Sequence, residues 1–487
     1  MKTDTIAAIA TALSDSGIGI IRVSGDEAIP IVRKIYRNKK NEDVLSDYKS
    51  HTIHYGFIID KNEYLLDEVM VSVMKNPHSY TTEDTVEINC HGGALMMKKI
   101  LMTVIEAGAR LAEPGEFTKR AFLNGRMDLS RAEAVMDMIH AKNQFALRSS
   151  IKQLRGSVFD KVKELREKVL YEIAFIESAL DDPEHISLDG YTERLSEQVR
   201  CLVKELEKLS DSADDGKMLK EGIRTVIVGK PNVGKSSLLN LLVGQDRAIV
   251  TDVAGTTRDT LEETVSLGDI TLNIIDTAGI RSTEDVVEKI GVEKAKMISE
   301  DADLILYVMD SSTPPDENDA DIVRMIKDKK TIILLNKSDL DEVVDQPTVD
   351  ALLSEVSEKK SVLYELSEGE DEKEKRQDGN ENIFIVKISA RENEGLDSLV
   401  NLIKKMFFHG ELTYDDEFCI TSSRHKEALL EALESMGQVR VSLENGMPED
   451  FYSIDLMNAY ASLGRIIGEE VGDDLVNEIF SKFCMGK

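Results

Sequence analysis

The chain has 487 residues, of which 41% are hydrophobic and 31% charged, and this length and composition suit a soluble protein of about three domains. Its formal net charge of −31 argues against a surface coated in nucleic acid, so any RNA contact must come from a local patch or a partner. The four scattered cysteines form no CxxC pair and predict neither a disulfide framework nor a zinc site. Because no run of 18 apolar residues and no convincing signal peptide is present, we expect a cytoplasmic protein with no membrane span.

The first part of the chain, residues 1–120, is predicted to form an α+β domain, because short β-rich runs accompany a helical run. The expected elements are strands at 17–23, 68–73 and 85–90 and a helix at 94–107. A helical domain follows, with its first part at residues 121–217. Between Arg131 and Leu209 apolar residues recur every three or four positions, the pattern of amphipathic helices. The polar stretch 211–222 is predicted to lead into the next domain.

Residues 218–408 alternate strand-like and helical runs, which predicts an α/β domain with a mostly parallel sheet. Residues 409–487 are interpreted as the second part of the helical domain, since the pattern is helical again from His425. The simplest arrangement inserts the α/β domain into one helical domain, although two separate helical domains would give the same pattern. The highly charged segment 354–382 is predicted to be a solvated loop or a disordered insert within the α/β domain, with a binding tail as the alternative.

The α/β domain opens on a phosphate-binding motif. Gly229 to Ser236 fits GxxxxGK[ST], follows a strand-like run at 224–228 and starts a helical one at 236–242. The unpaired N–H groups at a helix start and the glycine backbone can surround a polyphosphate. Lys235 is predicted to reach the β/γ oxygens, and the Ser236 hydroxyl to ligate Mg²⁺. The phosphate-loop residues predicted to contact GTP are Asn232, Val233, Gly234, Lys235, Ser236 and Ser237.

Three further motifs follow in order and complete the pattern of a guanine-nucleotide switch. Thr256 and Thr257 form a loop pair that senses γ-phosphate and Mg²⁺. The second, residues 276–279, follows an expected strand at 270–275. The third follows an expected strand at 331–335, and its Asp339 carboxylate can accept two hydrogen bonds from guanine, which adenine cannot offer. A further loop, Ser389 to Arg391, follows an expected strand at 383–388 and completes the pocket for the base. The nucleotide contacts predicted in these motifs and this loop are Thr256, Thr257, Asp276, Thr277, Ala278, Gly279, Asn336, Lys337, Asp339, Ser389, Ala390 and Arg391.

Two features of the switch concern hydrolysis. Ile280 stands where Ras-like switches place a glutamine that orients the attacking water, so another group must do this. The candidates in the charged stretch that follows are Glu284, Asp285, Glu288 and Glu293, and composition does not choose among them. Asn232 could ligate a monovalent cation beside the phosphates and supply the charge of an arginine finger, or it could serve only to shape the loop.

Over essentially its full length the chain resembles the bacterial tRNA-modification GTPases of the MnmE (TrmE) family. Three strings carry the resemblance beyond a generic GTPase: residues 4–11 with 17–25, residues 114–129, and the terminal Phe483-Cys484-Met485-Gly486-Lys487. The resemblance implies an N-terminal domain that binds formyl- or methylene-tetrahydrofolate and forms a homodimer. The positions that match its folate residues are Arg22, Glu87, Arg126 and Lys487, and Cys484 matches a C-terminal cysteine that is either catalytic or a structural thiol.

The resemblance also assigns roles in the switch. It implies that Asn232 ligates K⁺ and that Glu288 positions the attacking water. Backbone carbonyls at Thr251, Val253 and Thr256 would complete the K⁺ site, and Thr257 would join Ser236 on Mg²⁺. The catalytic set is then Lys235, Glu288 and Cys484, with GTP, Mg²⁺, K⁺ and the folate as ligands.

The family's partners follow from the same resemblance. An FAD-containing flavoprotein (MnmG, also called GidA) would form a heterotetramer with this chain, and together they would add an aminomethyl-type group to C5 of the wobble uridine of certain tRNAs. Two alternatives stay open: a regulatory GTPase, for instance in ribosome assembly, and a scaffold that binds GTP without useful turnover. The first would predict a basic or KH-like flank, and the intact Lys235, Ser236, Thr257 and Asp276 argue against the second.

Overall fold

The computed structural model divides the chain into two compact units, and each is described by itself. The first comprises Met1–Ile139, Ser150–Leu206 and Glu427–Lys487, and the second His140–Ser149 and Glu207–Lys426. The residues that the structure describes are 4–182, 184–185, 189–245, 263–268, 270–275, 302–326, 329–354, 360–364, 382–407, 420–469, 471–483 and 486.

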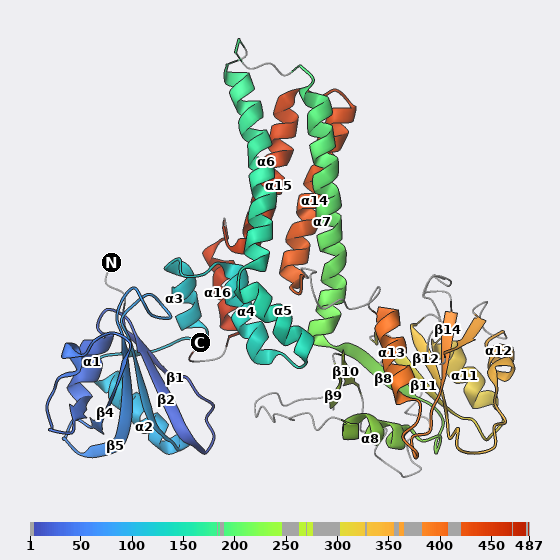
Figure 1. The fold of residues 1–487 in the computed structure, drawn as a ribbon, viewed down its shortest axis with the longest axis horizontal. Coiled ribbons are helices and arrows are strands. Elements are labelled where there is room, and N and C mark those ends of the chain that lie inside the picture. The colour runs from blue at the N-terminus through green and yellow to red at the C-terminus, as the bar shows by residue number, and fades with distance from the viewer. Residues whose placement is uncertain are drawn as a thin grey trace. The chain divides into compact units, whose positions relative to one another are not determined.

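The first unit begins with a sheet whose strands run in the order β3-β4-β5-β6-β2-β1-β7 (Figure 1). Neighbouring strands are antiparallel except for β1 and β7, which are parallel. The strands are β1 Ile6–Ile9, β2 Ser16–Ser24, β3 Tyr36–Asn38, β4 Thr52–Ile59, β5 Leu65–Met74, β6 Thr85–Gly92 and β7 Arg110–Leu111. The strands predicted within β2, β5 and β6 are therefore confirmed.

Two helices, α1 Ala28–Ile35 and α2 Ala94–Glu106, pack against this sheet. Alternate residues of the strands, such as Val71 and Val73, point into a shared core with Ile100 of α2, because side chains alternate between the two faces of a strand. The helix predicted at 94–107 is thus confirmed, and the mixture of strands and helices agrees with the predicted α+β domain.

The rest of the first unit is helical. Its elements include α3 Glu116–Leu123, α4 Leu129–His140, α6 Ser157–Asp181, α15 Glu449–Ile467 and α16 Asp473–Ser481. α6 and α15 pack along each other, and the guanidinium of Arg166 on α6 lies 3.9 Å from the centre of the Tyr460 ring. Three further helices, α5 Gln144–Leu154, α7 Tyr191–Glu221 and α14 Ser423–Glu444, contribute residues to both units.

The polar stretch 211–222 leads into the second sheet as predicted, and it does so as the last part of α7, which continues to Glu221 before β8 begins at Ile223. Ala213 is buried within it, so this part of the helix keeps one side packed. Among the helices that the structure describes, each is too short or too polar to span a bilayer.

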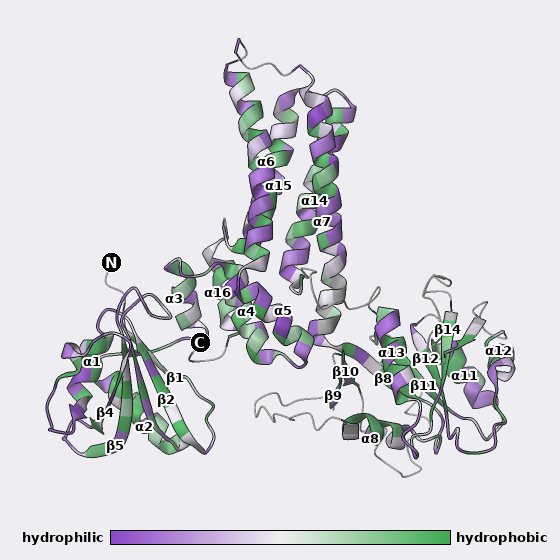
Figure 2. Cartoon of the chain, in the orientation of Figure 1, coloured by the Kyte–Doolittle hydropathy of each residue, from purple (hydrophilic) through white to green (hydrophobic). Residues whose placement is uncertain are grey.

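The second unit contains a sheet in the order β13-β14-β12-β11-β8-β10-β9, parallel throughout except for the β10–β9 pair. Its strands are β8 Ile223–Val228, β9 Glu263–Leu267, β10 Ile270–Ile274, β11 Leu304–Asp310, β12 Thr331–Asn336, β13 Lys360–Leu363 and β14 Asn382–Lys387. The predicted mostly parallel sheet and its strand positions are confirmed. Figure 2 shows that β11 and β12 are hydrophobic along much of their length, as strands covered on both faces must be.

Helices cover both faces of this sheet. The helices α8 Lys235–Gln245 and α13 Leu396–Phe407 share one core with residues such as Leu306, and α11 Glu317–Ile326 and α12 Gln346–Ser354 share the other with Tyr307. Neighbouring residues of β11 therefore serve opposite cores, as the strand period of two requires. Parallel strands end at one edge of the sheet, so this doubly covered arrangement gathers their following loops there.

The charged segment 354–382 is only partly as predicted. Lys360–Leu363 forms strand β13, which pairs in parallel with β14 at the edge of the sheet. The strand is only four residues long and lies at the edge of the sheet, so the charge of the surrounding segment conceals it. Residues 355–359 and 365–381 lie outside the described residues.

Candidate functional site

The phosphate loop lies between β8 and α8, as the motif predicts. Gly229 and Gly234 have φ angles of 152° and 102°, which side chains rarely adopt. A Cβ on Gly229 would lie 2.4 Å from the Val308 carbonyl oxygen, and one on Gly234 would lie 2.1 Å from the Asn336 Nδ2. Both glycines are therefore required by conformation and by space, and they leave backbone N–H groups free to approach a phosphate.

Lys235 begins α8 and its ammonium lies over the loop. It donates hydrogen bonds to the carbonyl oxygens of Gly229 and Lys230, at 2.7 and 2.6 Å. Burial lowers the pKa of Lys235, because the side chain is removed from water. The cation therefore lies against the loop on which the motif predicts the β/γ phosphates, and an anion bound beside it would favour its charged form. Asn232 has a φ of 63°, so it shapes the loop whatever else its amide does.

The end of β12 joins the phosphate loop to the predicted base loop. Asn336, which is 3% exposed, donates from Nδ2 to the Val233 carbonyl at 2.8 Å. Its Oδ1 accepts a hydrogen bond from the Ala390 N–H at 3.1 Å. One buried amide therefore uses both ends to hold two nucleotide loops that are 157 positions apart in the sequence at Val233 and Ala390.

The carboxylate predicted to bind guanine is oriented in advance. Ser389, fully buried, donates its hydroxyl to Asp339 Oδ1 at 2.7 Å, while Asp339 itself is exposed. Lys337 forms an ion pair with Asp310 at the end of β11. Burial alone would raise the pKa of Asp310, and hydrogen bonds from Lys337 and Ser312 outweigh it, so that pKa lies below its usual value. Sequence reasoning did not identify Asp310, whose signal is its place at a strand end.

A second cluster lies in the first unit, on β2 and β6. Arg22 and Glu87 face each other across these strands, and Arg22 Nε lies 2.9 Å from Glu87 Oε1. Their side chains are 15% and 23% exposed. The cross-strand register thus places together two of the residues that the resemblance associates with folate.

Arg126 joins this cluster through Tyr80, a residue that sequence reasoning missed. The Arg22 and Arg126 guanidinium carbons lie 5.5 and 4.7 Å from the centre of the Tyr80 ring. Arg126 also donates to the Tyr80 carbonyl oxygen at 3.1 Å, and the Tyr80 hydroxyl is 2.9 Å from the Thr118 hydroxyl. Both guanidinium groups therefore lie at cation–π distance from the Tyr80 ring. No sequence motif marked Tyr80.

The C-terminal end of the chain reaches the same cluster. Arg22 Nη1 donates to the Gly486 carbonyl at 2.9 Å. A Cβ on Gly486 would lie 2.5 Å from the Ile9 carbonyl oxygen, and a Cβ on Gly115 would lie 2.5 Å from the Phe480 carbonyl oxygen. Two segments separated by 464 positions therefore meet, as a site shared by the tail and the N-terminal domain requires. Cys484 and Lys487 lie outside the described residues.

Family models match both parts of the chain. The model described as the MnmE helical domain matches residues 129–484, and the one described as the GTP-binding protein TrmE N-terminus matches residues 5–126. The chain belongs to the MnmE (TrmE) family. A protein of Lachnoclostridium phytofermentans named tRNA modification GTPase MnmE is 54% identical over 487 residues, with 100% of each chain covered. One of the same name from Clostridioides difficile is 46% identical over 488 residues, with 99% of each covered.

Among solved structures, the G domain of the T. maritima FeoB iron transporter is 23% identical and covers 38% of this MnmE-family chain and 98% of that domain. Its TM-score is 0.24, and a likeness that low says nothing further about this chain.

Several predicted site residues of this MnmE-family chain lie outside the described residues. They are Thr251, Val253, Thr256, Thr257, Asp276, Thr277, Ala278, Gly279 and Glu288. Within the described part, no group of three or more His, Cys, Asp or Glu residues is arranged to hold a metal ion. Of the predicted Mg²⁺ ligands the described part contains Ser236, at the start of α8.

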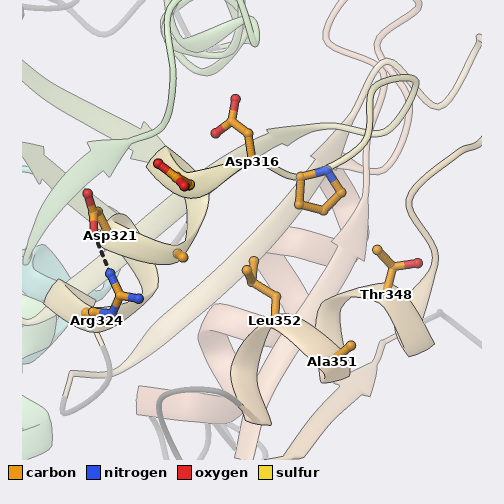
Figure 3. A pocket seen from close by; sticks show the side chains of 9 residues that line it. Asp316, Asp321, Arg324, Thr348, Ala351 and Leu352 are labelled. Carbon is orange, nitrogen blue, oxygen red and sulfur yellow. Dashed lines mark hydrogen bonds and ion pairs between the residues drawn. The ribbon is translucent and has the colours of Figure 1, made fainter.

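A shallow groove of about 550 Å³ lies between α11 and α12 (Figure 3). Its lining combines carboxylates such as Asp316 and Asp321 with the apolar side chain of Leu352, and Arg324 forms an ion pair with Asp321 along α11. None of the predicted nucleotide contacts lines this groove. The groove is therefore separate from the predicted nucleotide contacts, and its Asp316 forms an ion pair with Lys230 of the phosphate loop.

Proposed function

We propose that this chain is a tRNA modification GTPase that, with a flavoprotein partner, modifies C5 of the wobble uridine of certain tRNAs. Its relatives of 54% and 46% identity carry the name tRNA modification GTPase MnmE. The structural observation that supports its GTPase part is the Asn336 bridge, which joins the phosphate loop to the base loop through Val233 and Ala390. A site with both halves held together suits a guanine nucleotide rather than phosphate alone.

The proposed nucleotide chemistry uses groups that the chain positions itself. Glycine N–H groups and Lys235 would hold the phosphates, while Asp339, oriented by Ser389, would accept hydrogen bonds from the guanine edge. Mg²⁺, on Ser236 and Thr257, would neutralise charge on the phosphate oxygens. Glu288 would position the attacking water in place of the glutamine that Ile280 replaces.

Potassium dependence is part of the proposal. Asn232 holds a left-handed backbone conformation inside the phosphate loop, with a φ of 63°. An amide oxygen suits a monovalent cation, and carbonyls of Thr251, Val253 and Thr256 would complete the site. K⁺ would then supply the positive charge that an arginine finger supplies elsewhere.

The N-terminal cluster is proposed to bind a reduced folate. Arg22 and Arg126 carry the positive charge that its glutamate carboxylates need, and Glu87 offers acceptor oxygens to the donors of its pterin ring. Lys487 and Cys484 would join from the tail, which Gly486 brings to Arg22. The folate would supply the one-carbon unit, and the homodimer and the FAD-containing MnmG-type partner belong to the same proposal.

The experiment compares GTP turnover in K⁺ and in Na⁺ at equal ionic strength, for the parent protein and for Asn232→Ala. We expect turnover to rise markedly in K⁺ and the response to disappear in the variant. Equal parental rates in the two salts would remove K⁺ from the proposal. A parallel assay of wobble-uridine modification, with the flavoprotein partner, a reduced folate and GTP, distinguishes the proposal from a regulatory GTPase, which would hydrolyse GTP and modify nothing.

A further inference from the structure

The second lysine of the phosphate loop has partners of its own. Lys230 Nζ lies 2.7 Å from Asp319 Oδ2 and 3.0 Å from Asp316 Oδ2. Asp319 lies in the first turn of α11, and Asp316 immediately precedes that helix. The motif by itself would allow Lys230 to be a second phosphate-binding cation, yet its ammonium is engaged by two carboxylates of a different segment.

Asp319 is the centre of this arrangement. Its side chain is 2% exposed, and it accepts hydrogen bonds from Lys230, from the Tyr307 hydroxyl at 2.7 Å and from the Asp316 N–H at 2.9 Å. Tyr307 is fully buried on β11. A carboxylate this deeply buried is retained only with such donors, and removing one leaves an uncompensated charge. The Lys230 cluster, meaning Lys230, Asp316, Asp319 and Tyr307, therefore connects the loop to the strand β11 and to the start of the helix α11.

The Lys230 cluster differs from an ordinary surface ion pair. Exposed pairs contribute little because water and salt screen them, whereas the Lys230 side chain is 17% exposed and Asp319 is almost inaccessible. The far end of the loop is held separately, where Asn336 bonds to Val233. The loop is thus fixed by side chains near both ends, and Asn232 with its strained φ lies between the two points.

We propose that Lys230 is a positioning residue for the nucleotide. Its ion pairs with Asp319 and Asp316 hold the first half of the phosphate loop in the shape that accepts phosphates before any nucleotide binds. This inference rests on the proposed function for one point, which is that the ligand of the loop is a guanine nucleotide. Loss of the ion pairs would transfer the cost of ordering the loop to the binding step, since a preorganised site binds more tightly than one that must be ordered.

The test measures the Kd of GDP and the kcat and KM for GTP, together with the thermal midpoint of the nucleotide-free protein. The variants are Lys230→Met, which removes the cation, Lys230→Arg, which keeps it, and Asp319→Asn. Arg324→Met is the matched control, because Arg324 pairs with Asp321 on the same helix with both side chains exposed (Figure 3). Asp319→Asn combined with Lys230→Met completes a double-mutant cycle.

For Lys230→Met we expect the Kd of GDP and the KM for GTP to rise on the order of ten-fold or more, as the loss of a charge-assisted bond predicts, with a smaller change in kcat. Lys230→Arg should recover most of the affinity, and the double variant should bind no worse than the weaker single one. The control should bind as the parent does. The nucleotide-free midpoint should fall in Lys230→Met, because buried Asp319 loses its cation, and it should recover in part in the double variant, where that carboxylate is also neutral.

Parental affinity in Lys230→Met would overturn the inference. Nucleotide binding by Lys230→Arg as weak as that by Lys230→Met would also overturn it, because packing rather than charge would then determine the affinity. Strictly additive effects of the two substitutions on the Kd would overturn it as well. If the parent protein itself bound no guanine nucleotide, the proposed function would fail, and that result is separate from a defect confined to the variants.

Discussion

The phosphate loop and the N-terminal arginine cluster both suit anionic ligands, but they are constructed in different ways. The loop is one contiguous segment, Gly229 to Ser236, whose backbone N–H groups and half-buried Lys235 are proposed to hold the phosphates. The cluster collects Arg22, Arg126 and the tail at Gly486 from segments far apart in the sequence, around a tyrosine ring. A backbone site is therefore specified by a local motif, whereas a side-chain site depends on strand register and on the docking of the tail.

The largest effect is expected from a substitution that disturbs the phosphate loop and leaves the N-terminal arginine cluster intact. Gly234→Ala should lower kcat/KM for GTP by about 10²-fold, because the new Cβ would meet Asn336 Nδ2 at 2.1 Å and φ is 102°. Gly244→Ala, in the same segment with open space around it, is the control. Binding of a reduced folate should not change in either variant. A fully active Gly234→Ala would show that the loop can widen without loss.

The next effect concerns the tail. Gly486→Val should spare GTP hydrolysis and remove wobble-uridine modification, because a side chain at this φ of 90° would meet the Ile9 carbonyl. Deletion of residues 484–487 should do the same, and Gly472→Ala, which has open space, should do neither. Parental levels of modified uridine in the deletion, measured by mass spectrometry of tRNA nucleosides, would exclude the tail from the chemistry.

A smaller effect tests whether Tyr80 organises the arginines. Tyr80→Leu should weaken the Kd of a reduced folate by roughly five- to ten-fold, the contribution of partly buried cation–π contacts, with the GTPase rate unchanged. Tyr55→Leu removes a comparable ring, over which Lys39 lies at 4.5 Å, and should leave folate affinity intact. Equal losses in both variants, seen by calorimetry, would assign the effect to general weakening of the domain.

The smallest expected effect is a pH-dependent change in thermal stability that arises from Glu116 of the N-terminal region. Burial alone would raise the pKa of Glu116, and hydrogen bonds from Arg110, the Glu113 N–H and Arg120 outweigh it, so its folded pKa lies below the usual value. Its stabilising contribution is therefore present above the unfolded pKa and is lost as pH falls through the lower folded pKa. Glu116→Gln should lower the thermal midpoint by a few degrees at pH 7, and the difference should shrink below about pH 4. A constant difference across that range would contradict the pairing.

Much of the nucleotide domain followed from the sequence, because glycines, strand ends and motif spacing are local. The strand–loop–helix at β8 and α8 and the strands β10, β12 and β14 lie where the sequence predicts them. One local prediction was wrong in part, because composition reports exposure, not backbone conformation. The charged segment 354–382, predicted to be a solvated loop or a disordered insert, contains β13.

What the sequence determined by itself was chemistry that stays within a segment: the φ > 0 glycines, the lysine at a helix start and the alternation of strand and helix. Only the tertiary structure decided which distant residues meet. Tyr80 between two arginines, Gly486 against Arg22, and Lys230 on buried Asp319 depend on how sheets, helices and the tail pack. The physical reason is that a turn or a helix start is fixed by neighbouring residues, whereas a buried ion pair exists only once packing has excluded water from both partners.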